Sequence, residues 1–600
     1  MILLILLAYS LLVPNNLRST HAWIPDDARL NSIACLGGPG SGKSRLVGRL
    51  IAFLDFLRGI PVVILDPTGG TIDNFIHRVA LLPRPYQERL WPRVIYVDMS
   101  GHEKIVPFPL YYRLSPTESL ASIAKRFVET VRRLDPNLSN AAMEGWNAVS
   151  RLGTNAGMIL AALGLQITEA EDLIRNPAQW RPRFDQALAA FPEVRPAVDF
   201  FLEWGNDKKT KPDYRLRRSE SFLSKIQLFQ LDPTMRAMFG ASAPGLNWAP
   251  LFHQGYTVLI DFRHELTEEY RRFKLLWVFM YLYTYLNERG SAGRTQPVSV
   301  VIDELTEFVN FRASDGKSVL ADDLERLVSV IGRNYGVWLT LASQGLSQFD
   351  ERIQKMLGRM GSQIIGNTPD AEEAAYFARQ LIPYDPYLLK KKERVWMKID
   401  PMPIMTFFGG SEFPTPKVID ERTIELSPAE QSLLGMRQFQ ALEKLTFLVK
   451  LATAEGNLAA PLQKMSIASI DAGLYPDPLH ISQVRQMLSS RHGVEKESLL
   501  AEIDKRLNRE VIKKQVKSSH DYGKLNTSST PNQDSANQLS VVTEPATPVV
   551  LTNDHVTTTI STNQSLPNRN GTANRRPVTA PEEAARTRKG WEPIAEGEEA

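Results

Sequence analysis

Short apolar runs rich in valine and isoleucine recur along the chain, and they predict β-strands. Apolarity is almost continuous within each run rather than alternating, so both faces of the sheet are expected to be buried, as in parallel sheets. Helical segments separate several of the runs, which is typical of a doubly wound α/β fold. The predicted strands are Asn31–Leu36, Val62–Asp66, Val94–Asp98, Thr257–Asp261, Val298–Asp303, Val337–Ala342 and Gln363–Asn367.

Polar side chains stand at or just after the carboxyl ends of these predicted strands. In open α/β sheets, ligands bind beyond the carboxyl ends of the strands. The polar positions are therefore expected to gather at one edge of the sheet, and they are Asp66, Asp98, Asp261, Asp303 and Gln344.

A long stretch from about residue 115 to residue 239 has a helical pattern instead, with apolar residues such as Leu120, Ile123 and Phe127. It is too long for a loop and has little strand signal, so we expect an all-α domain inserted into the α/β core. The densest basic cluster of the chain lies within it. A solvated surface and a contact with nucleic acid or a protein partner both explain this cluster. Its members are Lys208, Lys209, Lys211, Arg215, Arg217 and Arg218.

The two ends of the chain differ from its middle in amino-acid composition. The apolar run Ile2–Val13 stops at Pro14 and is shorter than the roughly 20 residues that span a bilayer. It predicts a residual membrane anchor, a buried helix or an artefact of the start codon, and Arg18 would hold the rest in the cytoplasm if the run inserts. From about Lys517 onward, polar residues and proline dominate, which predicts a disordered tail.

Composition narrows the function classes. The chain has 600 residues, a hydrophobic fraction of 43% and a net charge of +3. These values predict several domains with real cores, and they exclude a globally basic coat for nucleic acid. The single cysteine, Cys35, excludes a disulfide framework and cysteine-based zinc sites. We expect Cys35 to be a buried small hydrophobe in a reducing compartment.

The strongest chemical signal is a glycine-rich loop between a predicted strand and a predicted helix, Arg45 to Leu57. It fits the phosphate-binding pattern G-x-x-x-x-G-K-[ST], in which glycines let backbone N–H groups converge on phosphate oxygens at a helix N-terminus. Lys43 is expected to reach the β- and γ-phosphates, and Ser44 to bind Mg²⁺. The expected nucleotide-binding residues are Gly37, Gly38, Pro39, Gly40, Ser41, Gly42, Lys43, Ser44 and Arg45.

Hydrolysis of a nucleotide needs a second motif, and the apolar strand that ends in Asp303-Glu304 supplies it. Asp303 is expected to hold the Mg²⁺ shell opposite Ser44. Glu304 is expected to polarise the attacking water, which is a general-base task that suits a carboxylate. The sequence therefore predicts an ATP hydrolase with ATP and Mg²⁺ as cofactors.

Two further positions complete the predicted catalytic set. Gln344 follows the next strand, where a side chain can sense the γ-phosphate or hold the water; a simple loop amide is the alternative. Arg333 precedes Gly336, which fits a helix C-terminal cap. Arg333 either complements the helix dipole or enters the active site of a neighbouring subunit as an arginine finger.

These motifs carry a resemblance to the HerA–FtsK superfamily, and within it to the coupling ATPases of conjugative type IV secretion. The resemblance covers roughly Ile33 to Pro416. Besides the phosphate loop and Asp303-Glu304, it rests on the turn Leu65–Gly70 and on Gly332–Gly336 followed by Ala342-Ser343-Gln344. Thr68 departs from the family, which usually has lysine there. The N-terminal part also departs from the family pattern, because this chain has one short apolar run where the family usually has two membrane helices.

The resemblance implies an α/β fold with a RecA-like P-loop ATPase core, a mainly parallel sheet and an all-α insertion domain, to which the composition adds a disordered C-terminal tail. It also implies that Arg333 is the arginine finger and Gln344 the sensor. The expected segments are 1–23 (short apolar segment), 24–114 (first segment of the ATPase core), 115–250 (all-α insertion), 251–425 (second segment of the ATPase core), 426–516 (helical region) and 517–600 (disordered tail).

The function implied is a ring motor, a hexamer, that translocates DNA through backbone contacts in a central channel. Its expected partners are secretion or relaxase-type proteins, and its expected place is the cytoplasm or the inner face of the cell membrane. A HerA-like helicase or translocase outside secretion and a ring ATPase that remodels proteins remain alternatives. A non-catalytic nucleotide switch is disfavoured by the Asp303-Glu304 pair.

Overall fold

The structure is a computed structural model, and it describes residues 26–102, 104–115, 117–134, 143–206, 209, 211–309, 320–396, 418–451, 462–467 and 476–507. All of them belong to the first of two compact units, Met1–Leu525. The apolar segment 1–23 and the predicted disordered tail 517–600 lie outside the described residues.

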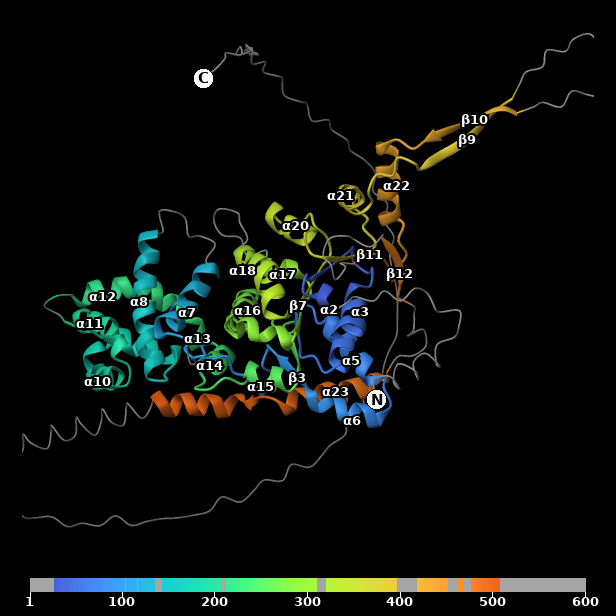
Figure 1. Cartoon of the computed structure of the whole chain (residues 1–600). Helices are drawn as coiled ribbons and strands as arrows, with labels where there is room; N and C mark the ends of the chain where they lie inside the picture. Colours follow the sequence, from blue (N-terminus) through green and yellow to red (C-terminus); the bar gives the residue numbers. More distant parts are fainter. Residues whose placement is uncertain are drawn as a thin grey trace, which may run out of the picture. The chain divides into compact units, whose positions relative to one another are not determined.

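One nine-stranded sheet forms the centre of this unit, with strand order β12-β11-β8-β1-β7-β6-β2-β5-β3 (Figure 1). From β8 to β3 every neighbouring pair is parallel, while β11 joins β8, and β12 joins β11, in antiparallel fashion. The sheet confirms the predicted fold class. Its strands are β1 (Ile33–Leu36), β2 (Val62–Asp66), β3 (Val94–Asp98), β5 (Thr257–Asp261), β6 (Val298–Ile302), β7 (Val337–Ser343), β8 (Ser362–Ile365), β11 (Thr446–Lys450) and β12 (Gln463–Ser466).

The predicted burial of both sheet faces is also confirmed. In β2, Val62 and Ile64 belong to one core cluster, whereas Val63 and Leu65 belong to another, and all four are fully buried. The first cluster lies under α3 (Lys43–Leu46), the π-helix η2 (Val47–Ala52), α4 (Phe53–Leu57), α5 (Gly70–Ala80), α6 (Arg84–Leu90) and α23 (Pro478–Arg491). The second lies under α16 (Glu268–Arg289), α17 (Leu305–Val309), α18 (Ala321–Arg326), α20 (Glu351–Gly358) and α21 (Ala371–Leu381).

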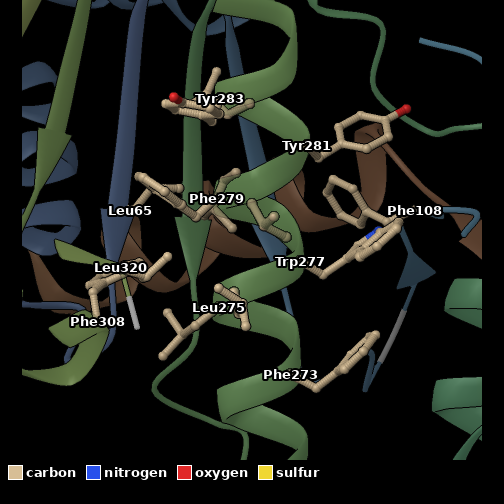
Figure 2. Packing of buried hydrophobic residues seen from close by; sticks show 14 of the residues in the cluster. Leu65, Phe108, Phe273, Leu275, Trp277, Phe279, Tyr281, Tyr283, Phe308 and Leu320 are labelled. Atoms are coloured by element: carbon tan, nitrogen blue, oxygen red, sulfur yellow. The ribbon is translucent and has the colours of Figure 1, made fainter. Parts of the chain in front are cut away.

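Helix α16 is buried on two sides, which explains its unbroken run of large apolar residues. Figure 2 shows Trp277 and Tyr281 on one side of the helix, next to Phe108, and Phe279 on the other side, toward Leu65 of the sheet. The rings of Phe108 and Tyr281 meet edge to face, with centroids 5.7 Å apart. A helix that is apolar all round must be covered on every side, and α16 thereby joins the sheet to the helices that follow β4 (Lys104–Ile105).

Between β4 and β5, the described elements are all helical, as the sequence pattern predicted. The insertion boundaries 115–250 stay a prediction. These helices are α7 (Leu120–Leu134), α8 (Met143–Ala162), α9 (Ala170–Arg175), α10 (Arg181–Ala190), α11 (Arg195–Trp204), α12 (Pro212–Ile226), α13 (Leu228–Leu231), α14 (Pro233–Gly240) and α15 (Trp248–His253).

The segment 426–516 was predicted to be helical, and that prediction is wrong in part. It contains α22 (Pro428–Gln440) and α23, but also β11 and β12, which extend the main sheet. Strand β11, Thr446–Lys450, pairs with β8 and has three apolar residues in a row, Phe447 to Val449. A run this short between helical patterns gives little periodicity to recognise. A separate two-stranded antiparallel ribbon consists of β9 (Leu389–Trp396) and β10 (Val418–Glu425).

Within the described ranges, no single helix is long and apolar enough to cross a membrane. One pair of helices, Trp146–Ala162 and Ile167–Arg175, passes the same test together, with a bend of 118° between them.

Candidate active site

The glycine-rich loop lies between β1 and α3, at the carboxyl edge of the parallel sheet. Gly40 and Gly42 have left-handed backbones, with φ angles of 75° and 102°, a conformation that glycine adopts without steric cost. Lys43 is buried, and its Nζ donates to the carbonyl oxygen of Gly37 at 2.6 Å. The ammonium group therefore lies over the loop, where the phosphates of a nucleotide would bind.

Residues far along the sequence hold this loop in place. The amide of Gly38 donates to the carbonyl oxygen of Asn367 at 2.6 Å, and the amide of Leu445 donates to the carbonyl oxygen of Ser41 at 2.9 Å. Leu445 itself has a φ of 65°, which is strained for a branched side chain. Neither support was predicted, because a backbone contact to a distant loop leaves no local motif in the sequence.

Ser44 and Asp303, the two predicted Mg²⁺ ligands, lie together. The Ser44 hydroxyl donates to Asp303 Oδ2 at 3.0 Å. A second hydroxyl, that of the buried Thr71, donates to the same oxygen at 2.5 Å. Among the described residues, no group of three or more histidines, cysteines or carboxylates forms a metal cage. A hydroxyl and one carboxylate nevertheless suit Mg²⁺, which is commonly held by few protein ligands together with substrate phosphates.

Thr71 was not predicted, and the turn after β2 explains its position. The carboxylate of Asp66 accepts hydrogen bonds from the backbone amides of Thr68 at 2.9 Å, Gly69 at 2.7 Å and Thr71 at 2.8 Å. This turn sets the first residues of α5 against the phosphate-loop helix. The contact is close, since a Cβ atom on Gly48 would lie 2.4 Å from the carbonyl oxygen of Thr71.

Charge is concentrated at this edge of the sheet. Burial is the main cause that raises the pKa of Asp66 to about 6, and the neighbouring carboxylate of Asp303 adds to it. The backbone amides that donate to Asp66 lower the pKa in part. Asp66 and Asp303 therefore repel each other, and a divalent cation at Asp303 would relieve that repulsion.

Glu304 and Gln344 meet at the end of the adjacent strands β6 and β7. The amide Nε2 of Gln344 donates to Glu304 Oε1 at 2.9 Å. Glu304 has a φ of 45° and its own amide donates to Asp303 Oδ1 at 3.0 Å. A non-glycine residue in this region costs roughly 1–3 kcal/mol, and such strain gathers at functional sites. The strained backbone turns the Glu304 carboxylate toward the strand that carries Gln344.

The pKa of Glu304 is raised, primarily because the carboxyl group is partly buried. The hydrogen bond from Gln344 acts in the opposite direction, since it stabilises the carboxylate. Asp303 raises the pKa further and Lys43 lowers it. A raised pKa gives a carboxylate more strength as a base near neutral pH, which suits the predicted role.

A Gln344→Ala variant is expected to shift the pH dependence of hydrolysis. Without the donated hydrogen bond, the pKa of Glu304 rises further, so the base is protonated at a higher pH and the acid limb of kcat moves to higher pH. On the plateau the rate should fall on the order of tenfold, which is the value of one hydrogen bond to a charged group. A pH profile of kcat with an unshifted acid limb would contradict this assignment.

Arg333 lies near the amino ends of the strands, at the end of the sheet opposite the phosphate loop. It belongs to α19 (Gly332–Tyr335), which ends at Gly336 with a φ of 69°, as predicted for a C-terminal cap. Strand β7 then runs for seven residues, about 20 Å, before its last residue, Ser343, pairs with Leu36 beside the phosphate loop. Arg333 is exposed, and within the described part of the chain no hydrogen bond or ion pair engages its side chain. It does not reach the phosphate loop of its own subunit.

Arg45 and Cys35 complete the set of predicted residues near the loop. Arg45 is half-buried in α3, directly after Ser44. Cys35 is fully buried in β1, and burial raises the pKa of its thiol to about 12. The interpretation of Cys35 as an inert core residue is therefore confirmed.

Comparisons with known proteins give matches among solved structures only. No protein-family model matches the chain, and no curated protein does. Among solved structures, the chain is similar to the bacterial conjugative coupling protein TrwB in its unbound form, with a TM-score of 0.43 and 17% identity over 74% of this chain and 86% of that chain. It is also similar to plasmid coupling protein TrwB in complex with ADP and Mg²⁺, with a TM-score of 0.40 and 16% identity over 75% and 90% of the two chains.

A third structure is VirB4 of Thermoanaerobacter pseudethanolicus, with a TM-score of 0.38 and 13% identity over 73% of this chain and 90% of that chain. The mainly parallel sheet and the glycine-rich loop that follows β1 confirm the predicted α/β class, and the resemblance of the motifs to the HerA–FtsK superfamily stays a prediction.

Proposed function

We propose that this protein hydrolyses ATP and uses the free energy to move DNA, as a ring motor of the conjugative coupling type. The observation that carries the proposal is the joint placement of two pairs at one sheet edge. Ser44 contacts Asp303 at 3.0 Å, and Gln344 contacts Glu304 at 2.9 Å. The first pair suits the metal of a nucleotide complex, and the second suits activation of water.

In this proposal the loop from Gly37 to Ser44 binds the triphosphate through its backbone amides. Lys43 exchanges its contact with the carbonyl oxygen of Gly37 for the β- and γ-phosphates. Ser44 and Asp303 would hold Mg²⁺, which would supply positive charge to the β- and γ-phosphates. Thr71 keeps the Asp303 carboxylate oriented, because its hydroxyl donates to the same oxygen as Ser44.

Glu304 accepts a proton from the attacking water, and Gln344 orients the Glu304 carboxylate and that water. The Gln344 amide has one further N–H for the water or the γ-phosphate, because only one hydrogen of its NH₂ group is needed for Glu304. Hydrolysis therefore has a base, an orienting amide and a phosphate-binding lysine within one subunit. The group that would stabilise charge on the transferred phosphoryl group comes from elsewhere.

Arg333 is that group in the proposal, and it comes from the neighbouring subunit. Its distance from the phosphate loop of its own chain, about the length of β7, supports action in a second copy. A contact between two different surfaces of identical chains is heterologous, and it closes into a ring when the rotation permits. Six subunits are the expected number, because the resemblance implies a hexamer.

DNA as the moved polymer rests on the resemblance of the motifs to those of coupling ATPases. The contacts are expected to be with the phosphate backbone in a central channel, so they should tolerate any sequence and weaken with salt. Relaxase-type or secretion proteins are the expected partners, and the cytoplasm or the inner face of the cell membrane is the expected place.

The rate of ATP hydrolysis with and without DNA tests the proposal. Full-length protein is mixed with ATP, Mg²⁺ and either single- or double-stranded DNA, and phosphate release is followed at low and moderate salt. We expect DNA to raise the rate, and the stimulation to fade as salt increases. A different result would favour a protein-remodelling ATPase. In that case neither single- nor double-stranded DNA would change the rate of hydrolysis, but an unfolded protein would raise it.

A further inference from the structure

Helix α12 (Pro212–Ile226) has one face fixed against the rest of the helical segment. Phe222 and Ile226 are 2% and 1% exposed. Phe222 lies against Gly153 of α8, so closely that a Cβ atom on Gly153 would be 2.7 Å from the Phe222 ring. Because one face is buried in this way, the opposite face of α12 is presented to solvent.

Along one border of the buried face, a row of exposed residues carries two cations on either side of an aromatic ring. We name this surface the α12 stripe, and it consists of Lys211, Tyr214 and Arg218, all of which are exposed. Tyr214 and Arg218 are four residues apart and therefore neighbours on the helix surface, and Lys211 is the N-cap residue three positions before Tyr214. The three positions span about 10 Å along the helix axis. Tyr214 is 47% exposed, and the guanidinium of Arg218 lies 5.0 Å from the centre of its ring.

Arg218 has no acidic residue at helical spacing on α12. The positions three and four residues from it are Arg215, Ser221, Tyr214 and Phe222. Residues at these spacings are neighbours on a helix surface. The positive charge of Arg218 is therefore not offset by its own helix.

Arg217, which is also exposed, has acidic residues at both helical spacings. Asp213 precedes it by four residues and Glu220 follows it by three. These two carboxylates offset the charge of Arg217. One helix therefore holds two exposed arginines in opposite electrostatic settings.

We propose that the α12 stripe binds single-stranded nucleic acid, with Lys211 and Arg218 on the phosphates and Tyr214 stacked on a base. This inference rests on the proposed function, because it names a contact for the polymer that the motor moves. A cationic track with an exposed aromatic ring supplies both parts of sequence-tolerant strand binding, charge and stacking. An acidic protein would use the cations but would leave the exposed ring without a role, so the strand is favoured.

Binding of full-length protein to a fluorescein-labelled oligothymidylate of about 20 nucleotides, longer than the strand-binding site of a typical domain, tests the inference. Fluorescence anisotropy is measured over a range of salt concentrations. Each phosphate contact on a single strand contributes about 0.7 to the slope of log K against log[salt]. The Lys211→Ala/Arg218→Ala variant is expected to bind more weakly and to lose about 1.4 from that slope.

Two further variants separate stacking from charge. Tyr214→Ala should weaken binding by about fivefold or more at an unchanged salt slope, because base stacking carries no counterion release. Tyr214→Phe should keep most of the affinity. Arg217→Ala is the matched control, since it removes an exposed arginine from the same helix, and its slope should stay close to that of the unmodified protein.

The outcomes separate this inference from the proposed function. Basal ATP hydrolysis without DNA should be unchanged in all these variants. If DNA stimulates hydrolysis but the stripe variants keep the original affinity and slope, the inference is wrong and the proposed function stands. If DNA does not stimulate hydrolysis but the slope falls as expected, the stripe still binds strands and the motor proposal is wrong. Equal competition by a polyglutamate peptide of matched charge would assign the stripe to an acidic protein.

Discussion

The Glu304→Gln variant is expected to bind ATP like the unmodified protein and to lose turnover by a factor of about 10²–10⁴, the usual contribution of a general base. Glutamine keeps the shape of glutamate and can still contact Gln344, so the loop geometry and the strained backbone at Glu304 are preserved. It cannot accept a proton. The loss should therefore appear in kcat, with the affinity for ATP retained.

The neighbouring carboxylates define the controls for this experiment. Glu307 lies one helical turn further on and raises the pKa of Glu304 through its charge. Glu307→Gln removes a carboxylate of the same chemistry near the site, and it should leave turnover within a few-fold of the original, as for a surface position. Lys43→Ala should instead lose ATP binding, because Lys43 is the only lysine of the phosphate loop.

Binding and turnover are measured separately, with a fluorescent ATP analogue and with phosphate release. A Glu304→Gln protein that hydrolyses ATP at the normal rate would remove Glu304 from the mechanism. A protein that loses binding as well would show that the carboxylate holds the loop rather than the water. Either result would leave the Ser44–Asp303 contact intact, so the two halves of the site are tested independently.

Much of the fold follows from the sequence because buried parallel strands leave a strong local signature. Val62–Asp66, Val94–Asp98 and Thr257–Asp261 have the predicted ends in the structure. Each is apolar on both faces, and an aspartate marks its carboxyl end. The phosphate loop and the Asp303-Glu304 pair were predictable for the same reason, because each is a short contiguous motif attached to such a strand.

Two residues of the site that the sequence did not predict, Thr71 and Leu445, are positioned by contacts between segments far apart in the chain. Thr71 reaches Asp303 because the Asp66 carboxylate shapes the turn after β2, and no pattern within the turn reveals which strand lies opposite. Leu445 supports Ser41 from more than four hundred residues away. Its positive φ is imposed by tertiary structure, against the preference of leucine. Local pattern therefore predicts the groups that act on the nucleotide better than the groups that hold them.

The Arg333→Ala variant is expected to reduce ATP hydrolysis by a factor of about 10³–10⁵, the effect of removing an arginine finger. The loss should occur although Arg333 lies about 20 Å, the length of β7, from the phosphate loop of its own chain. A helix-capping arginine would give a different result. Its removal would cost a few tenths to one kcal/mol of stability and leave hydrolysis nearly unchanged.

Mixing two inactive variants tests whether the site is shared between subunits. An Arg333→Ala subunit keeps the phosphate loop, and a Lys43→Ala subunit keeps the arginine. In a randomly mixed ring, about one quarter of the interfaces pair an intact loop with an intact arginine, because each partner is present at one half. Hydrolysis in an equal mixture should therefore recover to a sizeable fraction of that quarter.

Two controls make the rescue specific. A chain that carries both substitutions, mixed with Lys43→Ala subunits, forms no complete interface, so it should show no recovery. Arg359→Ala removes another arginine that precedes a strand of the same sheet, and it should keep most of the activity. Absence of rescue at every mixing ratio, with rings still formed, would assign Arg333 to the end of its helix. Rescue would instead place the completion of the site at the contact between two copies, which is the step that lets hydrolysis in one subunit move its neighbour.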